Sequence, residues 1–148
     1  GGFPIGAMLV AEKHAAVFEK GMHGTTFGGN HLATAVAYEV IRTIEAEKIL
    51  DHVKASARYL TSALNKLKEK YPDKITEIRG LGLLIGIVFK DSIEARPLIE
   101  KALQLGLIVG RGGNSVLRLA PPLNVRKPTM DSAIEKLDQL IAGILIPA

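Results

Sequence analysis

The 148-residue sequence contains no cysteine, which excludes disulfide bonds and catalysis by a thiol and fits a reducing cytoplasm. It also lacks any run of about 18 apolar residues, so no membrane-spanning segment is expected. His14, His31 and His52 are scattered without the spacing of metal ligands, so we predict no metal site.

Blocks of a single charge are also missing. The 19 basic and 15 acidic residues give a net charge of +4, and the densest basic run, residues 65–70, is interrupted by Glu69. Such mixed charges favour solubility over nucleic-acid binding. Hydrophobic residues make up 47% of the chain, which is enough for a packed core, and the length suits one domain or parts of two.

The sequence does not start with methionine and shows no signal peptide. It opens with GGFPIGAMLV, in which a glycine pair runs directly into an apolar segment. Such an opening is typical of the interior of a protein, so we expect the chain to be part of a longer one.

The first half is predicted to be mainly helical. Residues 5–10 are apolar and predict a short buried strand, and residues 11–21 predict a short helix that ends in glycine. Small and apolar residues recur at helical spacing over residues 31–48. The clearest helix covers residues 50–71, with an apolar stripe that consists of Leu50, Val53, Ala57, Leu60, Leu64, Leu67 and Tyr71.

The second half changes to shorter elements. Residues 75–90 predict two strands joined at the glycines of the segment 80–82. A helix is expected over residues 95–105, followed by the strands GLIVG and SVLRLAP on either side of a turn, RGGN.

Thr129 is expected to cap the N-terminus of a final helix. Its predicted buried face consists of Met130, Ile134, Leu137 and Ile141. The order of elements predicts an α/β protein with a boundary between residues 72 and 73, followed by a small α+β domain with a mainly antiparallel sheet.

A glycine-rich loop, HGTTFGGN at residues 23–30, directly precedes the helix expected from residue 31. A helix N-terminus offers unpartnered N–H groups and partial positive charge, which suit a phosphate, and threonine hydroxyls add further donors. The loop is not the G-x-x-x-x-G-K-[ST] motif of nucleotide-binding proteins. The residues alone therefore leave two alternatives, a phosphate site or a capped turn.

A second candidate is Arg118, which stands between Leu117 and Leu119 in the stretch VLRLAPPLN. If both leucines face a core, the alternation of a strand turns Arg118 outward. The arginine is then either a solvated charge or a guanidinium fork that holds a carboxylate through two hydrogen bonds.

Four stretches, in this order, resemble the class III, or ornithine-type, pyridoxal-phosphate aminotransferases: GGFPIGAMLV, HGTTFGGN, EIRGLGLLIGI and VLRLAPPLN. The resemblance covers nearly the whole chain and is greatest to the acetylornithine branch. It implies part of a fold-type-I transferase, with the end of the large cofactor-binding domain at residues 1–72 and the small C-terminal α+β domain at residues 73–148. His31 departs from the pattern, because many relatives have proline there.

The resemblance also implies roles for individual residues. Thr26 would contact the phosphate of pyridoxal 5'-phosphate across the interface of a homodimer, and Thr25 would lie at the substrate end of the site. Arg118 matches the arginine that binds the carboxylate of an amino-acid or 2-oxo-acid substrate. His23 is expected to fix the loop, and Arg79 is expected to be a structural charge at the edge of the small domain's sheet.

Transamination needs a lysine that forms a Schiff base with the cofactor and moves a proton. In the family this lysine stands in a K-x-L-G-G-G run, which would place it a few residues before Gly1. Lys13 and Lys20 do not substitute for it, so the chain alone, with no catalytic residue of its own, is expected to be inactive.

The implied activity of the whole protein is amino transfer between N-acetylornithine and 2-oxoglutarate in arginine biosynthesis. Two alternatives stay open. The donor could be ornithine, succinylornithine or a related ω-amino acid, or the chain could be a non-catalytic module for dimerisation or binding.

Overall fold

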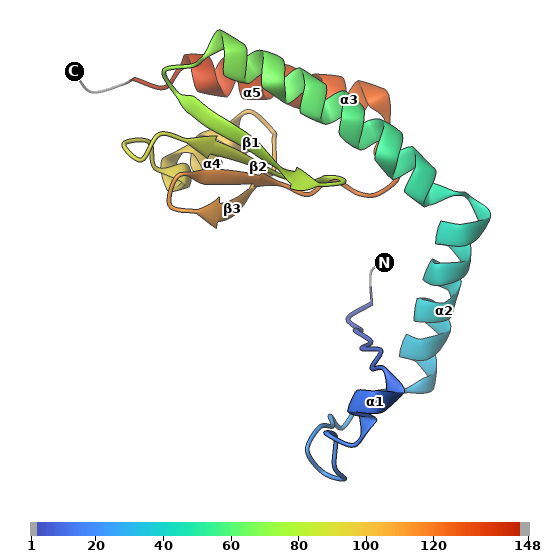
Figure 1. Cartoon of the computed structure of the whole chain (residues 1–148). Helices are drawn as coiled ribbons and strands as arrows, with labels where there is room; N and C mark the ends of the chain where they lie inside the picture. The colour runs from blue at the N-terminus through green and yellow to red at the C-terminus, as the bar shows by residue number, and fades with distance from the viewer. Residues whose placement is uncertain (1–2, 146–148) are drawn as a thin grey trace. The chain divides into compact units, whose positions relative to one another are not determined.

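The computed structural model describes residues 3–145, so Gly1 and Gly2, the opening of the first motif, lie outside it. The chain divides into two compact units, which meet in sequence between Lys48 and Ile49. The elements are α1 (Glu12–Ala15), α2 (His31–Ala46), α3 (Ile49–Lys70), β1 (Ile75–Leu81), β2 (Leu84–Phe89), α4 (Ala95–Gln104), β3 (Gly110–Gly113), β4 (Val116–Leu119) and α5 (Lys127–Ala142) (Figure 1). Within the described residues, no helix combines the length and apolarity needed to cross a bilayer.

The first unit is built around α2, which begins at the predicted residue. Asn30 has an extended backbone (φ −62°, ψ 152°), and its side chain accepts a hydrogen bond from the N–H of Ala33 over 2.9 Å. This bond satisfies one of the N–H groups that a helix start leaves without a partner. The expected helix over residues 31–48 is therefore confirmed, with its last turn at Ala46.

Two expectations for the first unit are wrong. Residues 5–10 form no strand, and Leu9 is 99% exposed. A strand needs a neighbour for its backbone hydrogen bonds, and the described part of this unit contains none. The helix expected over residues 11–21 is reduced to the four residues of α1, because Ala11 provides no side-chain cap and so short a helix gains little from propagation.

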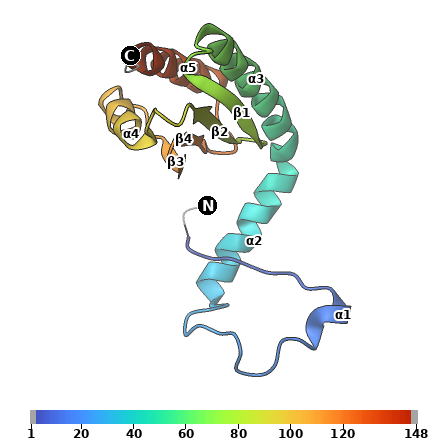
Figure 2. The same cartoon turned by 60° about the vertical axis from the view of Figure 1, so that its left-hand side comes forward.

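The second unit has two layers, a four-stranded sheet and three helices (Figure 2). The strand order is β1-β2-β4-β3, and every neighbouring pair is antiparallel. Helix α3 contacts β1, α4 contacts β3 and β4, and α5 contacts both of the other helices. The predicted antiparallel sheet is thus confirmed, with α3 as an additional helix that covers it.

The core lies between these two layers. Strand β2 alternates, with Ile85, Ile87 and Phe89 at most 2% exposed, and Leu117 in β4 is fully buried. These side chains pack against the stripe of α3, on which Leu60, Leu64 and Leu67 are buried as predicted. Leu50, the first residue of the predicted stripe, is an exception and is 59% exposed.

The packing of α3 explains why the units divide earlier than the sequence indicates. The sequence places a boundary after residue 72, whereas the compact units divide after Lys48. Lys48 has a left-handed backbone (φ 51°), a conformation that ends helices. Because α3 buries its apolar stripe against the sheet, it belongs to the same compact unit as β1.

Two local details of the second unit also differ from the expectations. Strand β3 begins at Gly110, the last residue of the expected strand 106–110, and continues over residues 111–113, which were expected to belong to the turn; Gly110 pairs with Arg118 and Gly113 pairs with Val116. The turn itself falls at Asn114 and Ser115.

Helix α5 begins two residues before Thr129, which therefore does not cap it. Arg126 is the N-cap residue, and Pro128, with its fixed φ, suits the first turn. The predicted apolar face is confirmed: Met130, Leu137 and Ile141 are buried, and Ile134 is partly buried.

Two aspartates of α5 tie this helix to α3. Asp131 accepts hydrogen bonds from the hydroxyl of Tyr59 and from Lys127, the latter over 2.8 Å. Asp138 accepts from the hydroxyl of Tyr71 over 2.6 Å and from Lys70 over 2.7 Å.

The last turn of α5 is held by an ammonium group. The nearly buried Lys74 donates to the carbonyl oxygen of Ile141 over 3.0 Å, and that of Ala142 lies at 3.4 Å. A cation at this end of a helix is favoured by the free carbonyls and by the helix dipole.

Acid should weaken the hydrogen bonds that Asp131 and Asp138 accept, and with them the attachment of α5 to α3. The hydrogen bond from Lys127, with a smaller contribution from Tyr59, holds the pKa of Asp131 below its ordinary value of 3.8. Lys70, followed by Tyr71, lowers the pKa of Asp138 in the same way. A carboxylate whose pKa is lowered by folding stabilises the fold at pH values above its ordinary pKa. This stabilisation is lost as the pH falls through the lowered pKa.

We expect the melting temperature of the chain, measured at low ionic strength, to fall as the pH is lowered from about 5 to about 2. The double variant Asp131→Asn/Asp138→Asn should show a smaller fall. Asp51→Asn is the control, because Asp51 is 73% exposed and its ion pair, with Lys54 at 3.4 Å, lies within α3. An equal fall in the double variant and in the wild type would contradict the role of the two aspartates.

Candidate functional site

The loop before α2 is held in shape by its own backbone and by Asn30. The carbonyl oxygen of Thr25 accepts from the N–H of Gly28 over 3.2 Å, and that of Phe27 accepts from the side-chain amide of Asn30 over 2.7 Å. Together with the cap on Ala33, these bonds fold the loop back onto the start of α2. The expectation that His23 fixes the loop is not supported, since the hydrogen bonds described for the loop come from Thr25, Phe27 and Asn30.

Two glycines fit this geometry. Gly29 has φ +69°, a left-handed backbone that side chains disfavour. A methyl group added at Gly28 would lie 2.7 Å from Oγ1 of Thr25, closer than the two atoms can approach. The glycines therefore let the loop turn tightly around the hydroxyl of Thr25.

A hollow of about 800 Å³ lies beside this loop within the first unit. The hollow is lined by residues 3–7, Thr25, residues 27–30, Ala33 and Thr34. The hollow thus offers two threonines, Thr25 and Thr34, and the glycines Gly28 and Gly29 next to a helix start, a combination that suits an anionic group. None of its described lining residues is a lysine.

Thr25 and Thr26 occupy different places. Thr25 lines the hollow, whereas Thr26 is exposed on the loop and does not line it. An exposed Thr26 is free to contact a group that another molecule provides.

Arg118 lies on the second unit, on the face of the sheet opposite the helices. Its neighbours Leu117 and Leu119 are buried and Arg118 is exposed, as the alternation predicted. In the register of the sheet, Arg118 stands between Gly86 of β2 and Gly110 of β3. Among the described residues, no carboxylate lies within salt-bridge distance of its guanidinium.

Arg79 shares this face because it pairs with Gly86 from the other side. It lies on the edge strand β1 and forms an exposed ion pair with Glu77 at 3.5 Å. Since Arg79 already has a carboxylate partner, this contact fits the expected structural charge. Arg118 is therefore the better candidate for binding an acidic ligand.

The segment after β4 is hydrogen-bonded to α3. The ring nitrogen Nε2 of His52 lies 2.9 Å from the carbonyl oxygen of Val125 and 3.2 Å from the hydroxyl of Ser56. Because a carbonyl only accepts, Nε2 carries the hydrogen and donates it to Val125. This bond restrains the chain a few residues beyond Arg118, so His52 has a structural contact that its sequence context did not indicate.

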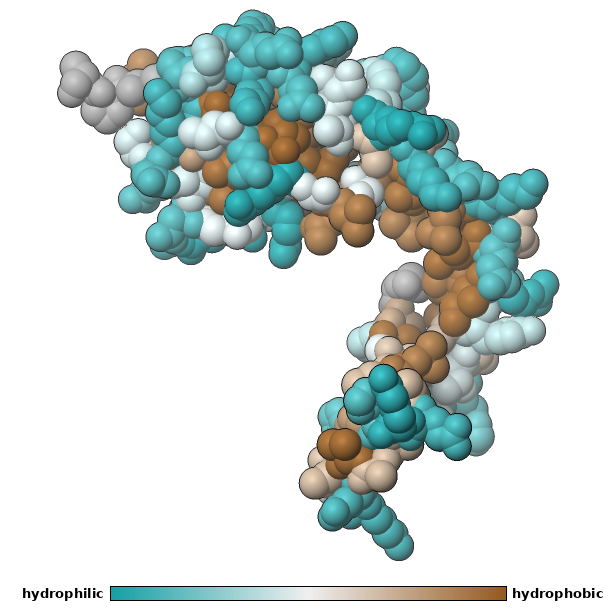
Figure 3. Space-filling model, in the orientation of Figure 1, coloured by the Kyte–Doolittle hydropathy of each residue, from teal (hydrophilic) through white to brown (hydrophobic). Residues whose placement is uncertain are grey.

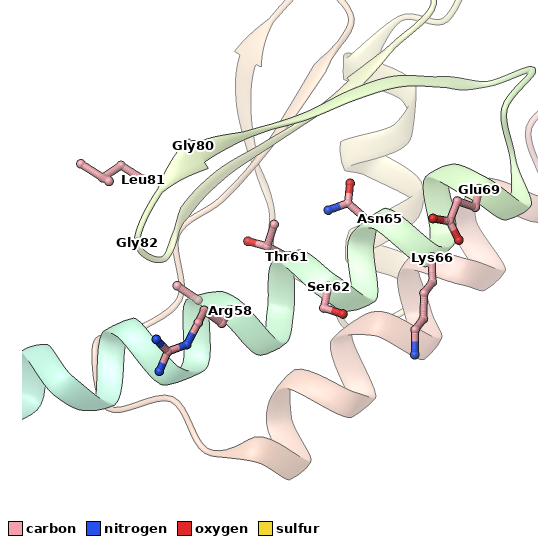
Figure 4. A pocket seen from close by; sticks show the side chains of 10 residues that line it. Arg58, Thr61, Ser62, Asn65, Lys66, Glu69, Gly80, Leu81 and Gly82 are labelled. Carbon is pink, nitrogen blue, oxygen red and sulfur yellow. The ribbon is translucent and has the colours of Figure 1, made fainter.

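A second hollow, of about 620 Å³, lies in the second unit between α3 and the turn that joins β1 to β2 (Figure 4). Figure 4 shows Thr61 and Asn65 rising from α3 toward the sheet, while Arg58 and Lys66 point away from it. Its lining contains positively charged, negatively charged and neutral polar side chains, so the hollow does not select for an anion or for a cation. None of the predicted site residues lines it.

The candidate site residues thus lie in separate units, with Thr25 and Thr26 in the first and Arg118 in the second. Gly110, the neighbour of Arg118, was missed by the sequence reasoning because it was only the last residue of the expected strand 106–110, and the sequence does not show which residue pairs with it. Only the pairing of β3 with β4 reveals that this glycine faces the arginine.

Comparisons with known proteins agree with these features. Residues 1–141 match the family described as Aminotransferase class-III. An acetylornithine aminotransferase from Synechocystis sp. is 41% identical over 147 residues, which are 98% of this chain and 34% of the relative. An acetylornithine/succinyldiaminopimelate aminotransferase from Buchnera aphidicola subsp. Acyrthosiphon pisum is 43% identical over 129 residues, which are 86% of this chain and 31% of the relative.

The fold matches as well. The crystal structure of acetylornithine aminotransferase from Elizabethkingia anophelis matches with a TM-score of 0.76 and 31% identity, over 87% of this chain and 33% of that one. The chain therefore spans about a third of the length of the relatives it matches. By its sequence and its mixed α/β fold, the chain belongs to the class III aminotransferases, which are fold-type-I enzymes that depend on pyridoxal phosphate.

Proposed function

We propose that the chain is part of an enzyme that transfers an amino group between N-acetylornithine and 2-oxoglutarate, in the cytoplasm and in arginine biosynthesis. The observation that carries the proposal is the similarity of nearly the whole chain to acetylornithine aminotransferases. The activity would belong to the longer protein, in which the first unit, Gly1–Lys48, would contribute to the large cofactor-binding domain and the second unit, Ile49–Ala148, would form the small domain.

The loop before α2 fits the phosphate of pyridoxal 5'-phosphate. It combines two threonine hydroxyls with glycine backbone. Because Gly28 has no side chain, the hydroxyl of Thr25 can lie close to its backbone. We assign Thr26 to the phosphate and Thr25 to the substrate end of the site. When bound, the cofactor withdraws electrons from the carbon that carries the amino group.

Arg118 would hold a substrate carboxylate. Its guanidinium is exposed, has no acidic partner among the described residues, and can donate two parallel hydrogen bonds to a carboxylate. Holding the substrate in this way orients its amino or keto group toward the cofactor. The same contact serves amino-acid and 2-oxo-acid substrates, because both carry the carboxylate.

A homodimer would explain the exposed apolar side chains of the first unit. Leu9, Phe27 and Leu32 are 99%, 81% and 64% exposed, and hydrophobic residues lie along α2 on the face shown in Figure 3. Exposed apolar surface of this extent is typical of an interaction site. In such a dimer, Thr26 would reach the cofactor of the partner subunit.

The first test is the donor profile of the full-length protein with 2-oxoglutarate and added pyridoxal phosphate. We expect the highest kcat/KM for N-acetylornithine. A higher value for ornithine or succinylornithine would change the assigned donor, and no transfer from any of the three would favour a non-catalytic module. This measurement decides between the alternatives that the sequence leaves open.

The roles of the two threonines can be separated with isosteric variants of the full-length protein. Thr26→Val should weaken cofactor binding about tenfold or more, because a hydrogen bond to a charged group is lost. Thr25→Val is the matched control and should raise the KM for the amino donor with little change in cofactor affinity. The reverse pattern, measured by cofactor titration and steady-state kinetics, would refute the assignment.

The 148-residue chain by itself should not transaminate, because none of the described residues that line the hollow is a lysine. Incubated with pyridoxal phosphate and reduced with borohydride, it should give no stoichiometric adduct at a single lysine. The full-length protein, treated in parallel, should give one. Turnover by the isolated chain, together with such an adduct, would disprove this expectation.

A further inference from the structure

Arg118 stands between two positions that have no side chain. Gly86 pairs with it from β2, and Gly110 pairs with it from β3. Residues directly opposite one another in antiparallel strands project from the same face of the sheet. The two glycines therefore leave bare backbone on both sides of the arginine.

The guanidinium of Arg118 lies beside Gly110 and not beside Gly86. A methyl group added at Gly110 would lie 3.0 Å from Nε, 3.1 Å from Nη2 and 3.4 Å from Cζ of Arg118. At Gly86 the same methyl group would meet Cγ1 of Val116 at 3.3 Å and Cγ of Arg79 at 3.7 Å. Arg118 thus leans toward β3 and lies over the backbone of Gly110.

The backbone does not explain why glycine occurs at either position. Neither Gly86 nor Gly110 has a positive φ, so alanine fits the backbone conformation at both. Glycine inside a strand costs stability relative to residues with side chains, and it often marks a close approach of another group. At Gly110, the group that approaches is the guanidinium of Arg118.

We propose that Gly110 is a positioning residue that sets the direction of Arg118 toward the substrate carboxylate. The inference rests on the proposed function, in which Arg118 binds that carboxylate. A methyl group at position 110 would push the guanidinium fork away from Gly110 by a few tenths of an ångström. Since a fork binds a carboxylate only in one plane, this displacement weakens substrate binding without removing the charge.

The test compares Gly110→Ala with Gly86→Ala in the full-length protein. Both variants add one methyl group beside Arg118, but only the first contacts the guanidinium. Gly110→Ala should raise the KM for N-acetylornithine or 2-oxoglutarate about tenfold, while kcat stays within about twofold. Gly86→Ala should leave the KM within about twofold. Equal KM values for the two variants would overturn the inference.

Arg118→Lys distinguishes failure of the inference from failure of the proposed function. If Arg118→Lys leaves the KM unchanged, the proposed role of Arg118 in binding the carboxylate is wrong. If Arg118→Lys raises the KM and Gly110→Ala does not, the proposed function survives and the inference fails. Gly110→Ala should also have less effect on the KM in the Arg118→Lys background, because the contact between the two residues is then absent.

Stability provides a second measurement in case Gly110→Ala is too unstable to assay. Its melting temperature should then recover in the Arg118→Lys background, where the methyl group no longer meets a guanidinium. Recovery supports the contact between Gly110 and Arg118, and an equally low melting temperature in both backgrounds overturns it.

Discussion

The alternation of side chains across the antiparallel sheet is the constraint on which the second unit depends. Strand β4 can bury Leu117 and Leu119 against the helices only if Arg118 points to the opposite face. A shift of one residue in its pairing would bury the guanidinium and expose both leucines, at a large cost in free energy. The packing that stabilises the core therefore also fixes the face on which an acidic ligand can be bound.

The first unit follows a different principle, because its loop owes its shape to polar contacts rather than to a core. Ala33 is the buried hydrophobic residue of α2, while Leu32 and Ile41 are exposed. Asn30 joins the loop to the helix by donating to Phe27 and accepting from Ala33. A loop held in this way keeps its threonines in place while the apolar surface around it stays available for a partner.

The sequence was sufficient where a pattern depends on one element alone. The stripe of α3, the apolar face of α5 and the outward direction of Arg118 each follow from spacing within a single segment. Features that need a second segment could not be predicted: residues 5–10 lack a neighbouring strand, and the glycines of β3 become a strand only through their pairing with β4. The position of Gly110 opposite Arg118 could not be predicted for the same reason.

Polar contacts attach α5 to the second unit at several points. Asp131 and Asp138 accept hydrogen bonds from Tyr59, Tyr71 and Lys70, and Lys74 donates to the last carbonyl groups of the helix. In acid, the hydrogen bonds at Asp131 and Asp138 would weaken, while the buried apolar face of α5, which includes Met130, Leu137 and Ile141, keeps the helix packed on the core. The second unit would therefore lose stability in acid without losing the packing of α5.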